Sequence, residues 1–477
     1  MRAPRLHRHG RANQHGAALM IMIVIMVAGV ASVLAGALSI SALQNARQEK
    51  TSAALAQAKD ALIGFSVKVL VSSSDVACAA TSNCPRPGDL PCPDTDNDGN
   101  AESSCGSADG STGQAARLGR LPWKTLGLPD LRDGSGERLW YAVSNRFKNN
   151  TRSTCNNSEL VTGCLNSDTP GTITVFAADG SILNDGGGTS GAAAVIIAPG
   201  AVLQRQGSGS MQDRSSGGVN SANNYLDIVT VGGNTQDNAG FVDSSATDGF
   251  IQGPVLDSTG RAIVNDQLLV ITQDNIMQPV QKRVAAEVKS CLTEYAAIPQ
   301  NRGISPNDGY YPWATTRTIS SGSVVYNDTD QLKFGHVPDL PFAQTCSDTG
   351  GSTCSSTQSG GMKNGWGATC TLNNSNWWVN WKEMVFYGLA HSLRPHNMTH
   401  NHVCPSAICL TVNPPSTDND KSFVVIVAGK KLGTQSRTST AQKNDQSNYL
   451  EGTNLSGTST FQQSPVSATF NDVTVFK

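Results

Sequence analysis

The feature that most constrains this chain is an uncharged, apolar stretch at residues 17–38, after which the next charged residue is Arg47. A run of about 20 apolar residues is long enough to cross a bilayer as one helix. Four arginines lie on its N-terminal side, at positions 2, 5, 8 and 11. Such a charge bias holds that side in the cytoplasm. The stretch therefore predicts one membrane-spanning helix, with the N-terminus cytoplasmic and the remaining chain exported.

The same stretch has two interpretations. A secretory signal peptide would use the small residues at 35–37 for cleavage, but its apolar part is usually about 7–15 residues, and here it is longer. In the second interpretation, residues 11–19 place Gly16 at the boundary between polar and apolar sequence. That arrangement resembles the prepilin leader of type IV pilins and type II secretion pseudopilins. The resemblance implies that a prepilin peptidase cuts after Gly16, methylates the amine of Ala17 and leaves the helix on the mature chain.

Ile21 occupies the fifth position of that mature chain, where major pilins of the family carry Glu. The lack of Glu resembles the minor pseudopilins at filament tips. The resemblance thus implies a minor or tip subunit of a type IV pilus or type II secretion-like filament. Its partners would be other pilin-like subunits and the prepilin peptidase. Its location would be the bacterial inner membrane, with the exported part periplasmic or on an extracellular filament.

The helix is expected to continue beyond the membrane. Residues 39–70 are rich in good helix formers and contain no proline. Apolar residues recur at three- and four-residue spacing, which gives one apolar face; they are Ala54, Ala58, Ala61, Leu62, Phe65 and Val69. We predict a helical spine over 17–70 after a leader at 1–16. The alternative is a separate amphipathic helix after a cleaved signal.

Composition limits what the exported part can do. About 400 residues follow the spine, enough for two domains of ordinary size. Only 15% of residues are charged and the net charge is −2, so no basic field points to nucleic acid. The abundance of Gly, Ser, Thr and Asn is typical of an exported, β-rich protein with long polar loops.

An internal repeat organises the exported part. Six short segments recur in the same order, among them Gly-Arg-Leu-Pro at 119–122 with Gly-His-Val-Pro at 335–338, and Asn-Tyr-Leu-Asp at 224–227 with Asn-Tyr-Leu-Glu at 448–451. Each copy predicts a helix followed by an irregular loop and apolar strands, an α+β unit. We predict two related pilin-like heads at 71–278 and 279–477, each an antiparallel sheet packed on a helix. The first sheet would contain strands at 139–143, 172–176, 193–198 and 268–272, and the second helix would span about 279–298.

The segments of the first copy also resemble a group of bacterial prepilin-type proteins, over roughly the first 280 residues. They are Leu-Pro-Cys-Pro-Asp at 90–94, Gly-Arg-Leu-Pro-Trp at 119–123 and Val-Ile-Ile-Ala-Pro-Gly at 195–200. This resemblance implies membership and location, and it brings no molecular activity with it.

All twelve cysteines follow the apolar stretch, and on an oxidising exported side paired disulfides are the default. Near neighbours could each close a loop: Cys78 with Cys84, Cys92 with Cys105, Cys155 with Cys164, Cys346 with Cys354, and Cys404 with Cys409. Cys291 and Cys370 are left over. Sequence alone does not fix the connectivity.

The clearest chemical motif is Asp94, Asp96 and Asp98 followed by Gly99. Carboxylates at alternate positions of a tight loop suit an oxygen-seeking cation such as Ca²⁺. The twelfth position of an EF-hand would be Glu and here is Cys105, so a full EF-hand is excluded, and Glu102 could complete the shell. The alternative is a solvated Asx turn. The second copy keeps only Asn-Asp-Gly at 307–309.

A second candidate combines His400, His402 and Cys404, which could ligate zinc or copper. Against it, Cys404 and Cys409 are well spaced for a disulfide. Four tryptophans between 366 and 381 could form an exposed binding face, but core packing is favoured. We find no nucleophile motif and predict no enzyme. The runner-up function is an exported, membrane-anchored, calcium-dependent adhesin or binding protein, and an exported hydrolase has the least support.

Overall fold

The computed structural model describes residues 15–69, 83–84, 86–107, 112–148, 150–151, 164–206, 209–215, 220–301, 309–320, 323–338, 365–373, 375–393, 404 and 409–477. Within these ranges it describes all side chains except those of 15–21, 23–24, 28–40, 83–84, 150–151, 300, 318–331, 375–376 and 391. The fold is mixed α+β, with long helices packed on antiparallel sheets, which confirms the predicted class.

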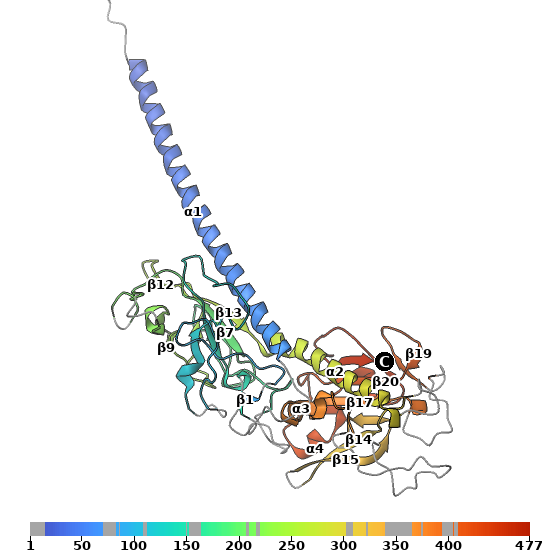
Figure 1. The fold of residues 1–477 in the computed structure, drawn as a ribbon. Coiled ribbons are helices and arrows are strands. Elements are labelled where there is room, and N and C mark those ends of the chain that lie inside the picture. The colour runs from blue at the N-terminus through green and yellow to red at the C-terminus, as the bar shows by residue number, and fades with distance from the viewer. Residues whose placement is uncertain are drawn as a thin grey trace, which may run out of the picture.

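The helix α1 (His15–Lys68) runs unbroken for 54 residues and projects far from the rest of the molecule (Figure 1). Residues 41–50 are exposed, whereas the following turns bury positions three or four apart against the core; these are Thr51, Ala54, Leu55, Ala58, Leu62 and Ser66. The turns of α1 after residue 50 are therefore a packing element of the folded body.

Within the part of the chain that the structure describes, no helix is long and apolar enough to cross a membrane. The predicted span at 17–38 lies in α1, but most of its side chains lie outside the described part. The span stays a prediction.

The sheet on which α1 packs has the order β13-β7-β3-β2 and is antiparallel throughout. Its strands are β2 (Leu118–Arg120), β3 (Trp140–Val143), β7 (Ala194–Ala198) and β13 (Gln267–Ile271). Alternate residues of β7 face different cores: Ala194 and Ile196 pack in the cluster that contains α1, while Val195 and Ile197 pack in a second cluster. Both faces of the sheet are thus covered.

The prediction for residues 172–176 was wrong. The strand β5 (Val175–Phe176) belongs to a separate sheet, in the order β10-β5-β6, with β6 (Ile182–Asn184) antiparallel and β10 (Phe250–Ile251) parallel to it. This sheet contributes to the second cluster, on the face of the main sheet that points away from α1. A short apolar run fits either layer, because alternation alone does not name a strand's partner.

The second long helix, α2 (Gln273–Ala297), packs on strands β20 and β22 of a sheet with the order β15-β14-β16-β17-β20-β22. Its strands are β14 (Ala314–Ser320), β15 (Ser323–Leu332), β16 (Phe334–His336), β17 (Val385–Leu389), β20 (Phe423–Val427) and β22 (Val473–Phe476). The helix begins six residues before the predicted start at Pro279. Thr272 caps it, accepting from the backbone of Asn275 in a capping box.

The two halves share one strand order. The run β2-β3-β7-β13 beside α1, here called the first unit, corresponds to β16-β17-β20-β22 beside α2, the second unit. The smaller sheet β10-β5-β6 corresponds to β21-β18-β19, made of β18 (Leu410–Val412), β19 (Asn419–Lys421) and β21 (Thr460–Phe461). In each, the central strand has one parallel and one antiparallel neighbour. The predicted sequence repeat therefore coincides with a repeated topology.

Hydrogen bonds repeat as well. The buried Tyr141 donates its hydroxyl to the carbonyl of Pro91, and Tyr387 donates to the carbonyl of Pro312, each at 3.1 Å. Counting from these prolines, Asp94 corresponds to Thr315: Asp94 bridges to Arg120, and Thr315 pairs with His336. The earlier match of Asp94 to residues 307–309 is therefore replaced, and 307 and 308 lie outside the described residues.

The remaining described helices and strands are short: β1 (Asn83–Cys84), β4 (Asn150–Thr151), β8 (Ile228–Val231), β9 (Asn234–Asp237), β11 (Val255–Leu256), β12 (Ala262–Val264), α3 (Ser375–Trp381) and α4 (Thr440–Lys443).

Three disulfides are resolved among the described residues. Cys92 joins Cys105 and Cys404 joins Cys409, which are two of the pairs that spacing suggested. Cys164 is also disulfide-bonded, but its predicted partner Cys155 lies outside the described residues. The third resolved bond joins Cys291 of α2 to Cys370, the two cysteines that spacing left over.

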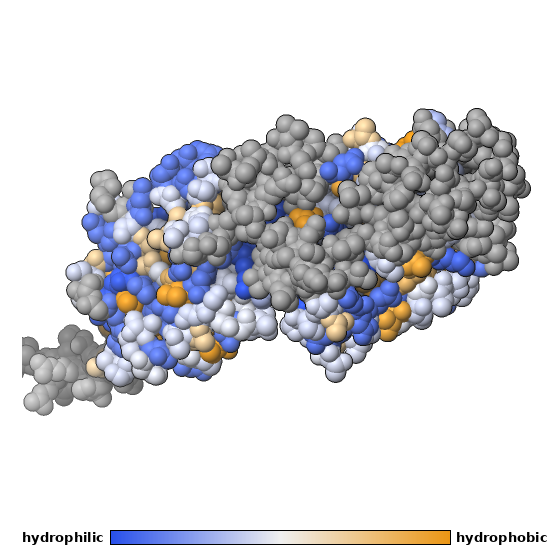
Figure 2. Space-filling view, turned by 90° about the horizontal axis from the view of Figure 1, so that it is seen from below, coloured by the Kyte–Doolittle hydropathy of each residue, from blue (hydrophilic) through white to orange (hydrophobic). Residues whose placement is uncertain are grey.

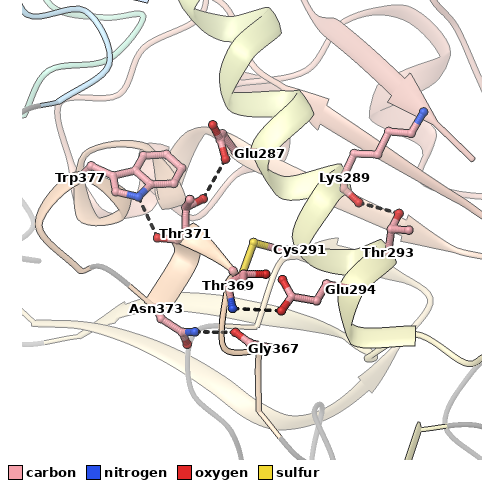
Figure 3. The surroundings of a disulfide bond; sticks show 11 residues. Glu287, Lys289, Cys291, Thr293, Glu294, Gly367, Thr369, Thr371, Asn373 and Trp377 are labelled. Carbon is pink, nitrogen blue, oxygen red and sulfur yellow. Dashed lines mark hydrogen bonds between the residues drawn. A yellow bond between two sulfur atoms is a disulfide. The ribbon is translucent and has the colours of Figure 1, made fainter. Parts of the chain in front are cut away.

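Figure 3 shows how the Cys291–Cys370 disulfide holds a loop on α2. Two glutamates of the helix accept hydrogen bonds from that loop: Glu287 from Thr371 and Glu294 from the backbone of Thr369, each at 3.0 Å. A Cβ at Gly367 would lie 2.1 Å from the carboxylate of Glu294, so a larger residue there would displace the Glu294 side chain from this position.

The four tryptophans between 366 and 381 lie in the hydrophobic core, as the sequence favoured. Trp366, Trp377, Trp378 and Trp381 are at most 9% exposed. The face of the molecule in Figure 2 is mostly hydrophilic where it is described, with small separate apolar areas. Scattered apolar residues of that kind are normal on a protein surface.

Candidate functional site

The acidic loop lies at the edge of the first sheet and is closed by the Cys92–Cys105 disulfide. Asp94 is 1% exposed, and its carboxylate accepts hydrogen bonds from the backbone amides of Asn97, Asp98 and Gly99, at 2.6, 3.2 and 2.7 Å. Burial raises the pKa of Asp94, and these amide donors oppose the rise. Asp94 therefore shapes the loop from the inside.

The carboxylates that converge are those of Asp94, Asp96 and Glu102, whose oxygens lie within 4.8 Å of one another. Asp98 is outside this group. Its oxygens accept from the backbone and side chain of Asn100, at 2.6 and 2.9 Å, and these bonds lower the pKa of Asp98. Three carboxylates at this spacing fit the oxygen ligands that Ca²⁺ takes. The candidate ligands that the structure brings together are thus Asp94, Asp96 and Glu102, without Asp98, and calcium binding there stays a prediction.

The histidine candidate receives no support from the geometry. His400 and His402 lie outside the described residues. Cys404 is held in a disulfide with Cys409, so its sulfur is not the thiolate that a metal would need.

The predicted processing residues Gly16 and Ala17 lie in the first turn of α1. The structure does not describe the surroundings of these two residues, and their processing stays a prediction.

A buried carboxyl pair, which the sequence did not single out, connects the last strand of the first unit to its Asn-Tyr-Leu-Asp turn. The backbone amide of Asp227 donates to Asp266 at 2.7 Å, and Asp227 accepts from the amide of Asn265 at 2.8 Å. Asn238 donates to the same oxygen of Asp266 at 2.9 Å. Burial raises the pKa of Asp227 to about 6, while burial and the charge of Asp227 together raise that of Asp266 well above its ordinary value.

The second unit repeats this carboxyl pair. The backbone amide of Glu451 donates to Asp472 at 3.1 Å, Asn454 donates to the same oxygen at 3.0 Å, and Glu451 accepts from the amide of Asn471 at 3.1 Å. Burial, followed by the charge of Glu451, raises the pKa of Asp472 well above its ordinary value. Each unit thus holds one buried carboxyl group whose pKa is raised well above its ordinary value.

Each unit places an arginine over the tyrosine of its repeated Asn-Tyr-Leu turn. Arg214 lies over the ring of Tyr225, and Arg437 lies over Tyr449, at 5.0 and 4.3 Å from the ring centres. Each arginine donates to the glycine that follows the central strand, Arg214 to Gly200 at 2.8 Å and Arg437 to Gly429 at 3.1 Å.

The units meet through residues 164–169 of the first, here called the docking loop. Ser167 donates to the carbonyl of Ala428 at 2.9 Å, and Asn380 accepts from the amide of Leu165 at 2.9 Å. Asp168 forms an ion pair with Arg437, with 2.8 Å between carboxylate oxygen and guanidinium nitrogen. These bonds fix the docking loop in the second unit.

Beside the docking loop is a cavity of about 880 Å³, lined by residues of both units and here called the interlobe cleft. Its cations are Arg146, Lys430, Lys431, Arg437 and Lys443, and its carboxylates are Asp168, Asp274 and Glu383. The volume is within the range of about 300–1,000 Å³ that small-molecule sites occupy.

These features define a mixed α+β protein in which a long helix and a repeated helix-on-sheet unit carry disulfide-tied loops. No family model, curated protein or solved structure matches the chain.

Proposed function

We propose that this protein is a minor subunit of a type IV pilus or type II secretion-like filament. Its helix α1 would anchor the chain in the bacterial inner membrane and later pack with other pilin-like subunits. The two units would be pilin-like heads that follow a leader at 1–16, and their shared strand order supports an origin by duplication.

The observation that carries the proposal is the form of α1. It is one uninterrupted helix, exposed over 41–50 and then packed on an antiparallel sheet. Met22, Ile25, Met26 and Val27 of its first half are 62–70% exposed. An apolar helix that leaves such side chains uncovered needs lipid or other helices around it.

Assembly can be tested through Ile25, which is 66% exposed. In cells that assemble the filament, Ile25→Asp should abolish recovery of the protein with sheared filaments, because a charge in a lipid-facing or helix-facing position is costly. The control variant Lys282→Glu changes an exposed residue of α2 and should leave recovery unchanged. Equal recovery of the Ile25→Asp variant would contradict the proposal.

The second candidate is an exported, membrane-anchored adhesin or binding protein that depends on calcium. The convergence of Asp94, Asp96 and Glu102 favours it. Recovery of the protein on the cell surface, without any filament subunit, and calcium-dependent adhesion there would support this candidate over the first.

A further inference from the structure

The two units use the same arginine differently. In the first unit, Arg214 pairs with Glu137 at 3.3 Å, and its Nη2 donates to Gln212 at 2.8 Å. In the second unit, Glu383 takes the place of Glu137. Glu137 lies three positions before Trp140, which pairs with Arg120, and Glu383 lies three positions before Phe386, which pairs with His336. The arginine of the first unit is therefore fully engaged within its own unit.

Glu383 is occupied by other partners. It pairs with Arg317 at 3.1 Å and Lys443 at 3.2 Å, and it accepts the hydroxyl of Tyr449 at 2.6 Å. Arg437 instead reaches Asp168 of the docking loop. Although Arg437 is only 5% exposed and lines the interlobe cleft, its Nη2 donates to no acceptor among the described residues. That atom is itself buried, so the positive charge that the cleft can offer a ligand comes from its other cations.

The charges that line the interlobe cleft are not balanced. Each carboxylate of the cleft already has a cation: Asp168 has Arg437, Glu383 has Lys443, and Asp274 has Lys430 at 2.5 Å. Arg146 and Lys431 form no ion pair with any residue in the described ranges. Five cations face three carboxylates, which leaves two positive charges at the cleft wall.

We propose that the interlobe cleft binds an acidic peptide segment through its carboxylates. Asp168 already shows that a carboxylate fits against Arg437 at 2.8 Å. The wall also offers amides and hydroxyls, from Asn166, Asn184 and Thr189, which suit a peptide backbone. No aromatic residue is among the cleft's described lining residues, so a sugar ring has no stacking surface there. This inference is independent of filament assembly.

The test measures binding of a fluorescein-labelled peptide of alternating Glu and Gly to the full-length protein in detergent, by fluorescence anisotropy at low salt. A peptide with Gln in place of Glu, inorganic phosphate and an oligogalacturonate serve as competitors. The double variant Arg146→Glu, Lys431→Glu reverses the two unpaired charges. The matched control, Lys50→Glu with Lys282→Glu, makes the same charge change at exposed positions of α1 and α2.

The proposal predicts that the Glu peptide binds, that the Gln peptide does not compete, and that the cleft variant weakens binding at least tenfold while the control variant changes it less than twofold. Melting curves of both variants are recorded as a check on folding, because Arg146 is half-buried. The single variant Lys431→Glu, at an exposed position, should weaken binding with an unchanged melting temperature. Equal weakening by the two variants would show non-specific charge attraction and overturn the proposal. So would the absence of binding, or competition by phosphate or oligogalacturonate that exceeds competition by unlabelled Glu peptide.

Discussion

Each folded unit holds two acidic side chains together in its interior. They are Asp227 and Asp266 in the first unit, and Glu451 and Asp472 in the second. Two buried carboxyl groups that interact share their titration, and one keeps its proton to higher pH. The same set of donors surrounds both pairs, from the adjoining asparagines and from the backbone of the turn.

A raised pKa in the folded state makes stability depend on pH with a definite sign. The folded unit binds more protons than the unfolded chain between the ordinary pKa of Asp and the raised one, so stability falls as pH rises through that interval. The interval extends to about 6 for Asp227 and further for Asp266. Each pKa unit corresponds to about 1.4 kcal/mol.

The variant Asp266→Asn should therefore lose part of this pH dependence and be more stable than the unaltered protein at pH 8, by about 1 kcal/mol or more. The amide oxygen can still accept from Asp227 and Asn238. Thermal unfolding at pH 5 and pH 8 measures the effect, with Glu49→Gln at an exposed position as control. An unchanged difference between the two pH values would show that the pair does not hold the extra proton.

The acidic loop gives a prediction that separates two adjacent carboxylates. Calcium should raise the melting temperature of the unaltered protein, and Asp96→Asn should abolish the rise, because Asp96 is in the converging group. Asp98→Asn should keep the rise, because Asp98 is outside that group. A melting temperature that calcium leaves unchanged in the unaltered protein would remove the site.

At the scale of elements, α1 is both a projecting rod and a part of the first core. Leu62 is fully buried among core residues, while Leu43 is 54% exposed. The turn that receives the helix fits tightly: a Cβ at Gly134 would lie 2.3 Å from the carbonyl oxygen of Arg47, and its amide donates to Thr51 at 2.9 Å.

Leu62→Ala should accordingly destabilise the folded body by about 2–5 kcal/mol, the usual cost of a large-to-small core change. Leu43→Ala removes the same atoms from an exposed turn and should change stability by less than about 0.5 kcal/mol. Urea unfolding followed by tryptophan fluorescence measures both. Similar losses for the two variants would mean that the end of α1 is not a core element.

The disulfides differ in the length of chain that they close. Cys291 and Cys370 are 79 residues apart, whereas Cys404 and Cys409 are 5 apart. A longer closed loop restricts the unfolded chain more. Replacing Cys291 and Cys370 by Ser should thus cost about 2–5 kcal/mol, more than the same change at Cys404 and Cys409. The reverse order of melting temperatures would contradict this explanation.

At the scale of the whole molecule, the sequence predicted the α+β class and the ordered repeat, because five of the repeated segments are strands or turns with similar apolar patterns. It missed the correspondence of Pro91 with Pro312, since the residues around them differ and only the tyrosine hydroxyls link them. It missed the Cys291–Cys370 bond because spacing favours near neighbours. Arg214 and Arg437 lie in polar loops without periodicity, so only their contacts reveal the shared role.

The central claim is that α1 remains on the working protein and begins at Ala17. The most direct measurement is the intact mass and N-terminal residue of the protein extracted from membranes of cells with an active prepilin peptidase. We predict a chain that starts at N-methylated Ala17 and retains all of α1. A mature chain that starts near Leu38, released from the membrane without the apolar stretch, would contradict the account.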